Sequence, residues 1–192
     1  MPPKTRFSRE EIINAAFEIA IKEGFNKITA RSVAERLNSS VAPIYVNFKT
    51  IDDLNAAVVE KVLTIPEKLI AEQNGASLFE KVGKASIVFA RKYPVLFREL
   101  VMKPNPYMPA YETVQEAMVE ALGEDEDMRD LSLEERRKLF LKMQIFQTGL
   151  SVMIANGNMP SWLDQKSAED LLMETGEELL NIIKINRKEN EQ

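Results

Sequence analysis

Pairs of a serine and a glutamate three residues apart recur along this sequence, and they constrain its fold more than any other feature. In such a pair, called a capping box, the hydroxyl and the carboxylate bind backbone N–H groups that the first turn of a helix leaves without partners. Apolar residues at helical spacing follow each pair. The chain is therefore predicted to be all-α, with about nine helices. The pairs are Ser8 and Glu11, Ser77 and Glu80, and Ser132 and Glu135.

Other residues set the expected ends of the helices. Gly24 and Asn38 tolerate a left-handed backbone and are expected to end the first two helices. Pro66 is expected to kink or break the fourth, because a proline inside a helix removes one hydrogen bond. Looser caps are predicted at Thr50 with Asp53 and at Ser167 with Asp170. The predicted helices cover residues 8–23, 30–37, 41–46, 50–73, 77–92, 94–103, 109–122, 132–156 and 167–187.

The chain contains neither cysteine nor histidine, and several kinds of site are thereby excluded. Disulfides, thiolate or imidazole zinc sites and serine–histidine relays all need one of these residues. No apolar stretch reaches the roughly 20 residues of a membrane span, and the N-terminus lacks the apolar core of a signal peptide. A cytoplasmic protein without cofactor, metal or membrane partner is the expectation.

Charge is distributed unevenly along the chain. Residues 1–50 contain eight basic and five acidic residues, a net charge of +3, whereas the remainder carries −8. A basic segment on an acidic body favours a local site for a polyanion. The acidic run 124–127 lacks the alternating ligands and turn glycine of a calcium loop, and a solvated loop is expected there.

The first three predicted helices form a helix-turn-helix arrangement. The helix at 41–46 is too short to be stable alone, so neighbouring helices must hold it in place. Ile44 and Phe48 can bury one side of it. Its other side carries small residues, which allow the backbone to approach base edges and phosphates closely. These residues are Ser40, Val41, Ala42 and Pro43.

The segment "IINAAFEIAIKEGFNKITARSVAERLNSSVAPIYVNFKTIDDL" resembles the N-terminal domain of the TetR-like (tetracycline-repressor) family of bacterial transcription regulators. The resemblance covers about the first quarter of the chain and includes the Gly24–Phe25 turn, the Val33–Ala34 pair and "IYVNF". Three positions depart from the family pattern. Asn38 replaces the usual glycine of the turn and Asn47 the frequent histidine. Ile51 replaces a common lysine, so that lysine's phosphate contact is lost or is taken by Lys49.

The resemblance implies which residues bind DNA. Val41, Ala42 and Pro43 would face the bases, while the side chains just after them would bind phosphates. Thr29 and Arg31 would anchor the preceding helix. The complete predicted set is Thr29, Arg31, Ser40, Val41, Ala42, Pro43, Tyr45, Asn47 and Lys49. Phosphate contacts give affinity and register, and base contacts give sequence preference.

The resemblance also implies a two-domain organisation. Residues 1–50 would form the DNA-binding domain, connected through the helix 50–73, and residues 51–192 a helical domain for ligand binding and dimerisation. An apolar or amphipathic ligand is expected, because aromatic and methionine side chains recur there. The candidate pocket residues are Phe89, Tyr93, Phe97, Met102, Tyr111, Met118, Met143, Phe146 and Gln147.

The last two predicted helices are apolar on more than one side. A helix of that kind must be buried on two sides, which favours a four-helix interface between two copies of the chain over a self-contained bundle. The candidate interface residues are Phe146, Gly149, Leu150, Met153, Leu172, Gly176, Leu179 and Ile183.

The predicted function is a DNA-binding transcriptional regulator, a repressor, that binds a palindromic operator as a homodimer and is released by a small effector. One alternative is an adaptor that uses the helix-turn-helix to bind protein. Another is an all-helical enzyme, against which the carboxylates Glu116, Glu120 and Glu134 have no imidazole partner and no phosphate-binding glycine motif is present.

Overall fold

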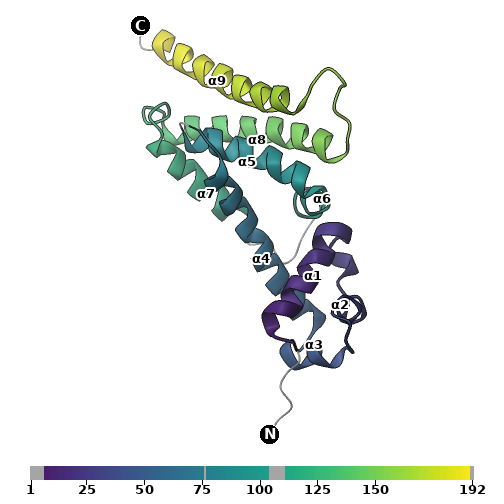
Figure 1. Ribbon diagram of the computed structural model, residues 1–192. Coiled ribbons are helices and arrows are strands. Elements are labelled where there is room, and N and C mark those ends of the chain that lie inside the picture. The colour runs from purple at the N-terminus through teal and green to yellow at the C-terminus, as the bar shows by residue number, and fades with distance from the viewer. Residues whose placement is uncertain (1–6, 76, 104–110, 191–192) are drawn as a thin grey trace. The chain divides into compact units, whose positions relative to one another are not determined.

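The computed structural model describes residues 7–75, 77–103 and 111–190 (Figure 1). Within these ranges the chain forms nine α-helices, two short 3₁₀ helices and no strand, as the capping boxes predicted. The α-helices are α1 (Arg9–Glu23), α2 (Ala30–Arg36), α3 (Ala42–Asn47), α4 (Ile51–Glu72), α5 (Leu78–Lys92), α6 (Pro94–Val101), α7 (Tyr111–Ala121), α8 (Leu133–Ala155) and α9 (Gln165–Asn190). The 3₁₀ helices are η1 (Phe25–Lys27) and η2 (Leu122–Glu124).

Most helix starts have the predicted caps. Complete capping boxes open α1 at Ser8 and α8 at Ser132, and the Thr50 hydroxyl accepts a hydrogen bond from the Asp53 amide at 3.1 Å. The cap predicted at Ser167 is wrong. Helix α9 starts earlier, at Gln165, and Asp164, the residue directly before it, accepts the Ser167 amide at 2.8 Å as an N-cap.

Helix α4 continues through Pro66, so the predicted break does not occur. A proline removes only one hydrogen bond, and the residues on both sides of it anchor this helix. Val62, Ile65 and Leu69 are all buried, and their burial offsets the lost bond.

The described residues divide into two compact units. Unit 1 contains α1, α2, α3, α6 and the part of α4 up to Glu67, and unit 2 contains the rest of α4 with α5, α7, α8 and α9. In unit 1, Ile12, Ala16, Val33, Ile44 and Leu54 are almost completely buried. Gly24, with φ at 94°, ends α1 as predicted.

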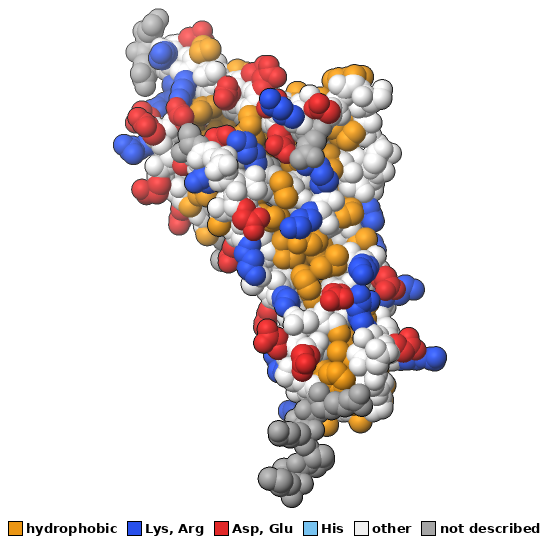
Figure 2. Space-filling view, viewed as in Figure 1, with side chains coloured by type: hydrophobic (Ala, Val, Ile, Leu, Met, Phe, Trp, Pro, Cys, Tyr) orange, Lys and Arg blue, Asp and Glu red, His pale blue; other side chains and the backbone are white. Residues whose placement is uncertain are grey.

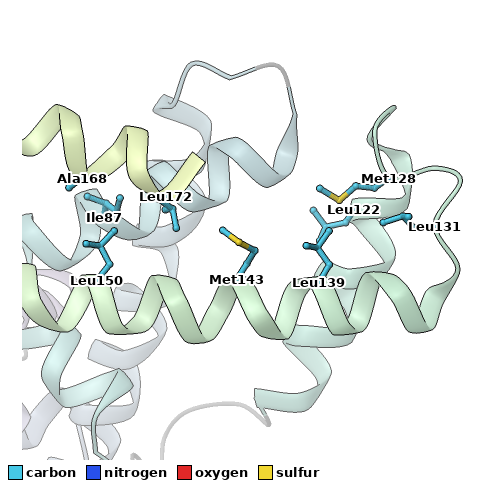
Figure 3. Close-up of a cluster of buried hydrophobic side chains, with 9 residues drawn as sticks. All are labelled: Ile87, Leu122, Met128, Leu131, Leu139, Met143, Leu150, Ala168 and Leu172. Atoms are coloured by element: carbon cyan, nitrogen blue, oxygen red, sulfur yellow. The ribbon is translucent and has the colours of Figure 1, made fainter. Parts of the chain in front are cut away.

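The core of unit 2 is a cluster of nine buried side chains from α5, η2, α8, α9 and the loop before α8 (Figure 3). Asp125, part of the acidic run, closes one end of this core: its carboxylate accepts the amides of Leu78 and Phe79 at 3.0 and 3.2 Å. It therefore caps α5. The described residues contain no group of acidic side chains arranged to hold a metal ion. None of the described helices is both long and apolar enough to cross a bilayer.

Candidate nucleic-acid interface

The turn between α2 and α3 is closed by backbone hydrogen bonds. The Ser39 amide donates to the Ala34 carbonyl at 2.9 Å, and the Leu37 amide donates to the Val33 carbonyl at 3.0 Å. Asn38 lies between them with φ at 49°, the left-handed conformation predicted for it. This conformation is sterically costly for most residues but is tolerated by asparagine, so the turn keeps its shape without a glycine.

Helix α3 has one buried side and one exposed side. Ile44 is completely buried and Phe48 nearly so, which fixes the helix against the rest of unit 1. On the opposite side Val46 is 69% exposed and Tyr45 53% exposed. Val41 caps the helix without a side-chain hydrogen bond, and Pro43 lies in its first turn, where a proline costs nothing. The predicted base-facing residues thus lie on an accessible helix.

Val46 was not among the predicted DNA-binding residues, yet among the described residues of unit 1 it is the most exposed large apolar side chain. The signal in the sequence was its spacing from Ile44. Two positions correspond to a rotation of about 200° around a helix, which places Val46 on the side away from the buried residue. Ala42, two positions before Ile44, is also exposed and lies next to Val46 on this side.

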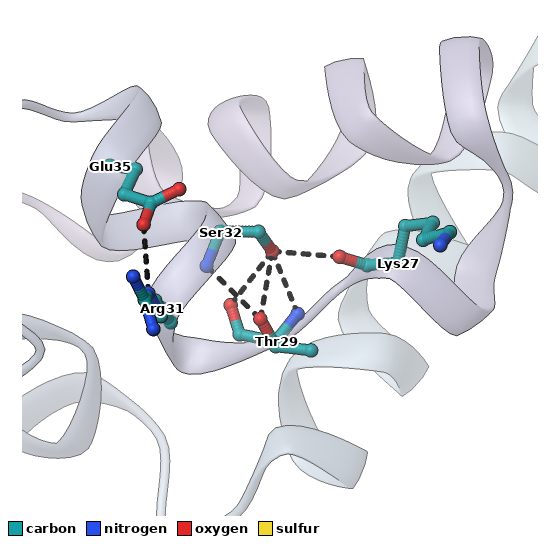
Figure 4. A network of polar contacts seen from close by, with 5 residues as sticks. All are labelled: Lys27, Thr29, Arg31, Ser32 and Glu35. Atoms are coloured by element: carbon teal, nitrogen blue, oxygen red, sulfur yellow. Dashed lines mark hydrogen bonds and ion pairs between the residues drawn. The ribbon is translucent and has the colours of Figure 1, made fainter.

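Thr29 and Arg31 are both engaged in local contacts at the start of α2 (Figure 4). The Thr29 hydroxyl accepts the Ser32 amide at 3.0 Å, and the Ser32 hydroxyl accepts the Thr29 amide at 3.0 Å, forming a capping box. The Arg31 guanidinium lies 2.9 Å from the Glu35 carboxylate, and both side chains are exposed. An exposed ion pair of this kind contributes about 1 kcal/mol or less, so a phosphate can compete for Arg31.

Asn47, the last residue of α3, and Lys49, two residues later, have different surroundings. The Asn47 side-chain amide donates to the Pro43 carbonyl at 2.9 Å and to the Phe7 carbonyl at 3.5 Å. It therefore stabilises the end of α3. Lys49 is exposed at the edge of a shallow hollow that Arg9 and Asp53 also line, and the Arg9 guanidinium lies 4.7 Å from the centre of the Phe48 ring.

The first turn of α4 is acidic, with Asp52 and Asp53 following the position where the family commonly has lysine and this chain has Ile51. Carboxylates stabilise a helix N-terminus by interacting with its dipole, but they repel phosphate from it. Charges on the face shown in Figure 2 are mixed, and neither sign forms a continuous field. Arg36 is paired with Glu18 at 2.6 Å, whereas Lys49 is exposed.

Unit 2 contains a cavity of about 200 Å³, the second candidate site. Of the predicted pocket residues, Met118, Met143 and Gln147 line it, and Phe89 and Phe146 do not. Tyr93, Phe97 and Met102 belong to unit 1, and the Tyr111 side chain lies outside the described residues. The prediction missed Gln115 and Gln144, although Gln144 stands three residues before Gln147 on the same side of α8.

The predicted interface between two copies needs correction. Leu150 and Leu172 are buried in the core of unit 2, and a Cβ on Gly176 would lie 2.8 Å from the Phe79 ring of the same chain. These three residues are therefore not available to a second copy. Phe146, Leu179 and Ile183 also pack against this core. Gly149 and Met153 are exposed and stay candidates.

The sequence and the fold were compared with known proteins. A model of the family described as "Bacterial regulatory proteins, tetR family" matches residues 12–58, which contain α2, α3 and most of α1. The fold is similar to the crystal structure of a transcriptional regulator from Rhodococcus sp. Rha1, with a TM-score of 0.55 and 16% sequence identity, over 91% of this chain and 97% of that chain. No curated protein sequence matches the chain significantly. Residues 12–58 are therefore identified as a domain of the tetR family of bacterial regulatory proteins.

Proposed function

We propose that this DNA-binding regulator is a repressor that binds a palindromic operator as a homodimer and dissociates from it when a small effector binds unit 2. The observation that carries the DNA-binding part is the two-sided character of α3. One side is fixed by the buried Ile44 and Phe48. The other presents only short side chains and Tyr45, so the helix can lie deep in the major groove.

The exposed side of α3 also indicates how sequence is recognised. Ala42 and Val46 offer methyl groups, which contact the C5-methyl group of thymine, while no long polar side chain reaches for guanine. Sequence preference would then come from thymine methyls together with DNA shape. Val46 joins the predicted set of base-facing residues on this argument.

Two features support dimerisation: helix α3 is short, and apolar side chains of α8 and α9 are exposed. The six residues of α3 span roughly 9 Å at ~1.5 Å per residue, enough for only a few base pairs. Two copies about 34 Å apart would read one side of a palindrome. On α8, Ile145 is 66% and Leu141 55% exposed, in line with the exposed Gly149, and Ile182 and Ile185 are exposed on α9. Burying this apolar face against a second copy would stabilise a dimer.

The test is a titration of DNA from upstream of the gene at several salt concentrations. Phosphate binding releases counterions, so affinity should fall steeply as salt rises. Lys49→Ala should weaken binding to all sequences alike and lower the salt slope by about one per site, while Val46→Ala should change the sequence preference. Lys22→Ala, at the exposed end of α1, is the matched control.

Binding that is absent, or that does not change with salt, would instead support the adaptor. That alternative has one observation in its favour, because apolar side chains such as Val46 and Tyr45 are exposed on α3. The effector part is tested separately, by release of bound DNA when a ligand of unit 2 is added.

A further inference from the structure

A cavity adjoins the core of unit 2 at Met143 and Leu122. Figure 3 shows the buried cluster in two groups, one around Ile87, Leu150 and Leu172 and the other around Leu122 and Leu139, with Met143 between them. The cavity of about 200 Å³ lies at Met143. Protein cores are normally packed as densely as organic crystals, so a gap of this size invites a ligand.

The described lining of this cavity contains no ionisable side chain. It consists of apolar residues from α5, α7, η2, α8 and α9 together with Gln115, Gln144 and Gln147. Two charged residues that adjoin lining positions, Glu80 and Glu116, are paired with other side chains: Glu80 with Lys84, and Glu116 with Arg137 at 2.6 Å. A buried charge without a partner costs several kcal/mol or more. The cavity therefore disfavours both anionic and cationic ligands.

Two of the three glutamines that line the cavity, Gln144 and Gln147, lie along one stripe of α8. Phe140, Gln144, Gln147 and Ser151 are spaced four, three and four residues apart, which places them on the same side of the helix. The Gln115 amide nitrogen donates to the Gln144 carbonyl oxygen at 2.7 Å. The Ser151 hydroxyl, further along the stripe, is buried and has no hydrogen-bond partner. Ser151 is not part of the described lining of the cavity, so the polar groups that a ligand can reach there are the glutamines.

The size of the cavity limits the ligand. A cavity of about 150 Å³ in another protein holds a benzene ring. On that scale, a volume of about 200 Å³ accommodates roughly ten non-hydrogen atoms, such as one substituted ring or a short acyl chain.

We infer that unit 2 binds an uncharged, largely apolar molecule of roughly ten non-hydrogen atoms, carrying one hydroxyl, carbonyl or amide group that hydrogen-bonds to the glutamines of α7 and α8. This inference rests on the proposed function only in taking that molecule as the effector. The binding itself is independent of DNA.

The test measures binding of four probes of one shape to the full chain by calorimetry at pH 7, without DNA. 4-Propylphenol should bind most tightly. Propylbenzene, which lacks the hydroxyl, should bind roughly threefold to tenfold more weakly. 4-Propylbenzoate and 4-propylbenzylammonium should bind at least about thirtyfold more weakly, because each carries a charge into an uncharged cavity. No binding by any probe, or equal binding of phenol and benzoate, would overturn the inference.

Variants of the glutamines locate the site. Gln144→Leu combined with Gln147→Leu should remove the preference for 4-propylphenol over propylbenzene, whereas Gln73→Leu, directly after α4 and outside the cavity lining, should leave it unchanged. Gln144→Glu should raise affinity for 4-propylbenzylammonium at least about tenfold, a gain that misfolding cannot produce. A preference that persists in the double variant, or no gain in the glutamate variant, overturns the assignment of the site.

Release of DNA by 4-propylphenol is a separate measurement. If the probe binds with the expected preferences but DNA stays bound, the ligand class stands and the proposed effector role fails. If DNA binding itself is absent, the calorimetry still decides the ligand class.

Discussion

Units 1 and 2 are both helical, but the candidate site of unit 1 lies on its surface, whereas that of unit 2 lies in its interior. In the core of unit 1, Ile12, Ala16, Val33 and Ile44 are almost completely buried, and the candidate site of this unit is an exposed surface. Unit 2 has a gap in its core, and its candidate ligand site is that gap. A surface that binds a rigid polymer needs a rigid support, while a ligand enclosed by protein needs space inside it. The way each core is packed therefore indicates the kind of partner.

Among the variants that test this comparison, Ile44→Ala is expected to have the largest effect on stability and DNA binding. Ile44, on the inner side of α3, is completely buried. Its truncation should therefore lower the free energy of unfolding by about 2–5 kcal/mol and abolish DNA binding. Val46→Ala, two positions away and exposed, should change stability by less than about 0.5 kcal/mol. Urea denaturation of both variants measures the difference. Similar losses in the two would show that the assigned sides of α3 are wrong.

A second large effect is expected from Ile145→Asp on the exposed side of α8. If this face joins two copies, a charge there should weaken the dimer by roughly a hundredfold, since an unpaired charge at the centre of an interface is costly. Analytical ultracentrifugation over a range of concentrations measures the dissociation constant. Leu133→Asp, exposed at the first turn of the same helix, is the matched control and should leave the dimer intact.

A smaller effect is expected from Asp125→Ala. The Asp125 carboxylate accepts two amides at the start of α5, and loss of such a cap costs about 0.5–2 kcal/mol. Because Phe79, which lines the cavity, is one of the two amide donors, ligand affinity should fall together with stability. Glu126→Ala, at the exposed next position, should leave both quantities unchanged. Unchanged ligand affinity in Asp125→Ala would show that the cap of α5 does not influence ligand binding in the cavity.

The smallest effect concerns pH. Hydrogen bonds from the Ser8 backbone and side chain lower the pKa of Glu11 in unit 1, and hydrogen bonds from the Ser132 side chain and backbone lower the pKa of Glu135 in unit 2. Because the pKa is lowered in the folded state, each ionised carboxylate stabilises the fold at a pH above its unfolded pKa of about 4.3. This stabilisation is lost as the pH falls below that value and through the lower pKa of the folded state. Urea midpoints between pH 6 and pH 3 should therefore decrease less in Glu11→Gln and Glu135→Gln than in the original chain. An unchanged decrease in both variants would contradict these cap assignments.

The positions of the helices were predicted from the sequence more accurately than the contacts between them. Caps are local: Ser8 and Ser132 contact residues three positions away, so a short window contains the information. The start of α9 was misplaced because the residue that caps it, Asp164, precedes the serine that we assigned as the cap. The exposed helix-turn-helix was predictable for a similar reason, since one buried position, Ile44, fixes which side faces outward.

The cavity and the interface could not be predicted in the same way. A methionine on an apolar stripe looks the same whether it fills a core or lines a gap, and the difference depends on which side chains lie opposite it. Leu172 and Gly176 illustrate this: both fitted an interface stripe, yet α5 and α8 of the same chain cover them. Gln115 and Gln144 are 29 residues apart in sequence and lie on different helices, so their contact could not be predicted from the periodicity of either helix.

Pro66 has a consequence for the stability of α4. The boundary between the two units falls at residue 67 of this helix, and a proline at position 66 supplies no amide hydrogen to the Val62 carbonyl four residues earlier. At this point α4 lacks one backbone hydrogen bond, and its continuity depends on buried side chains on both sides of the proline, Val62, Ile65 and Leu69.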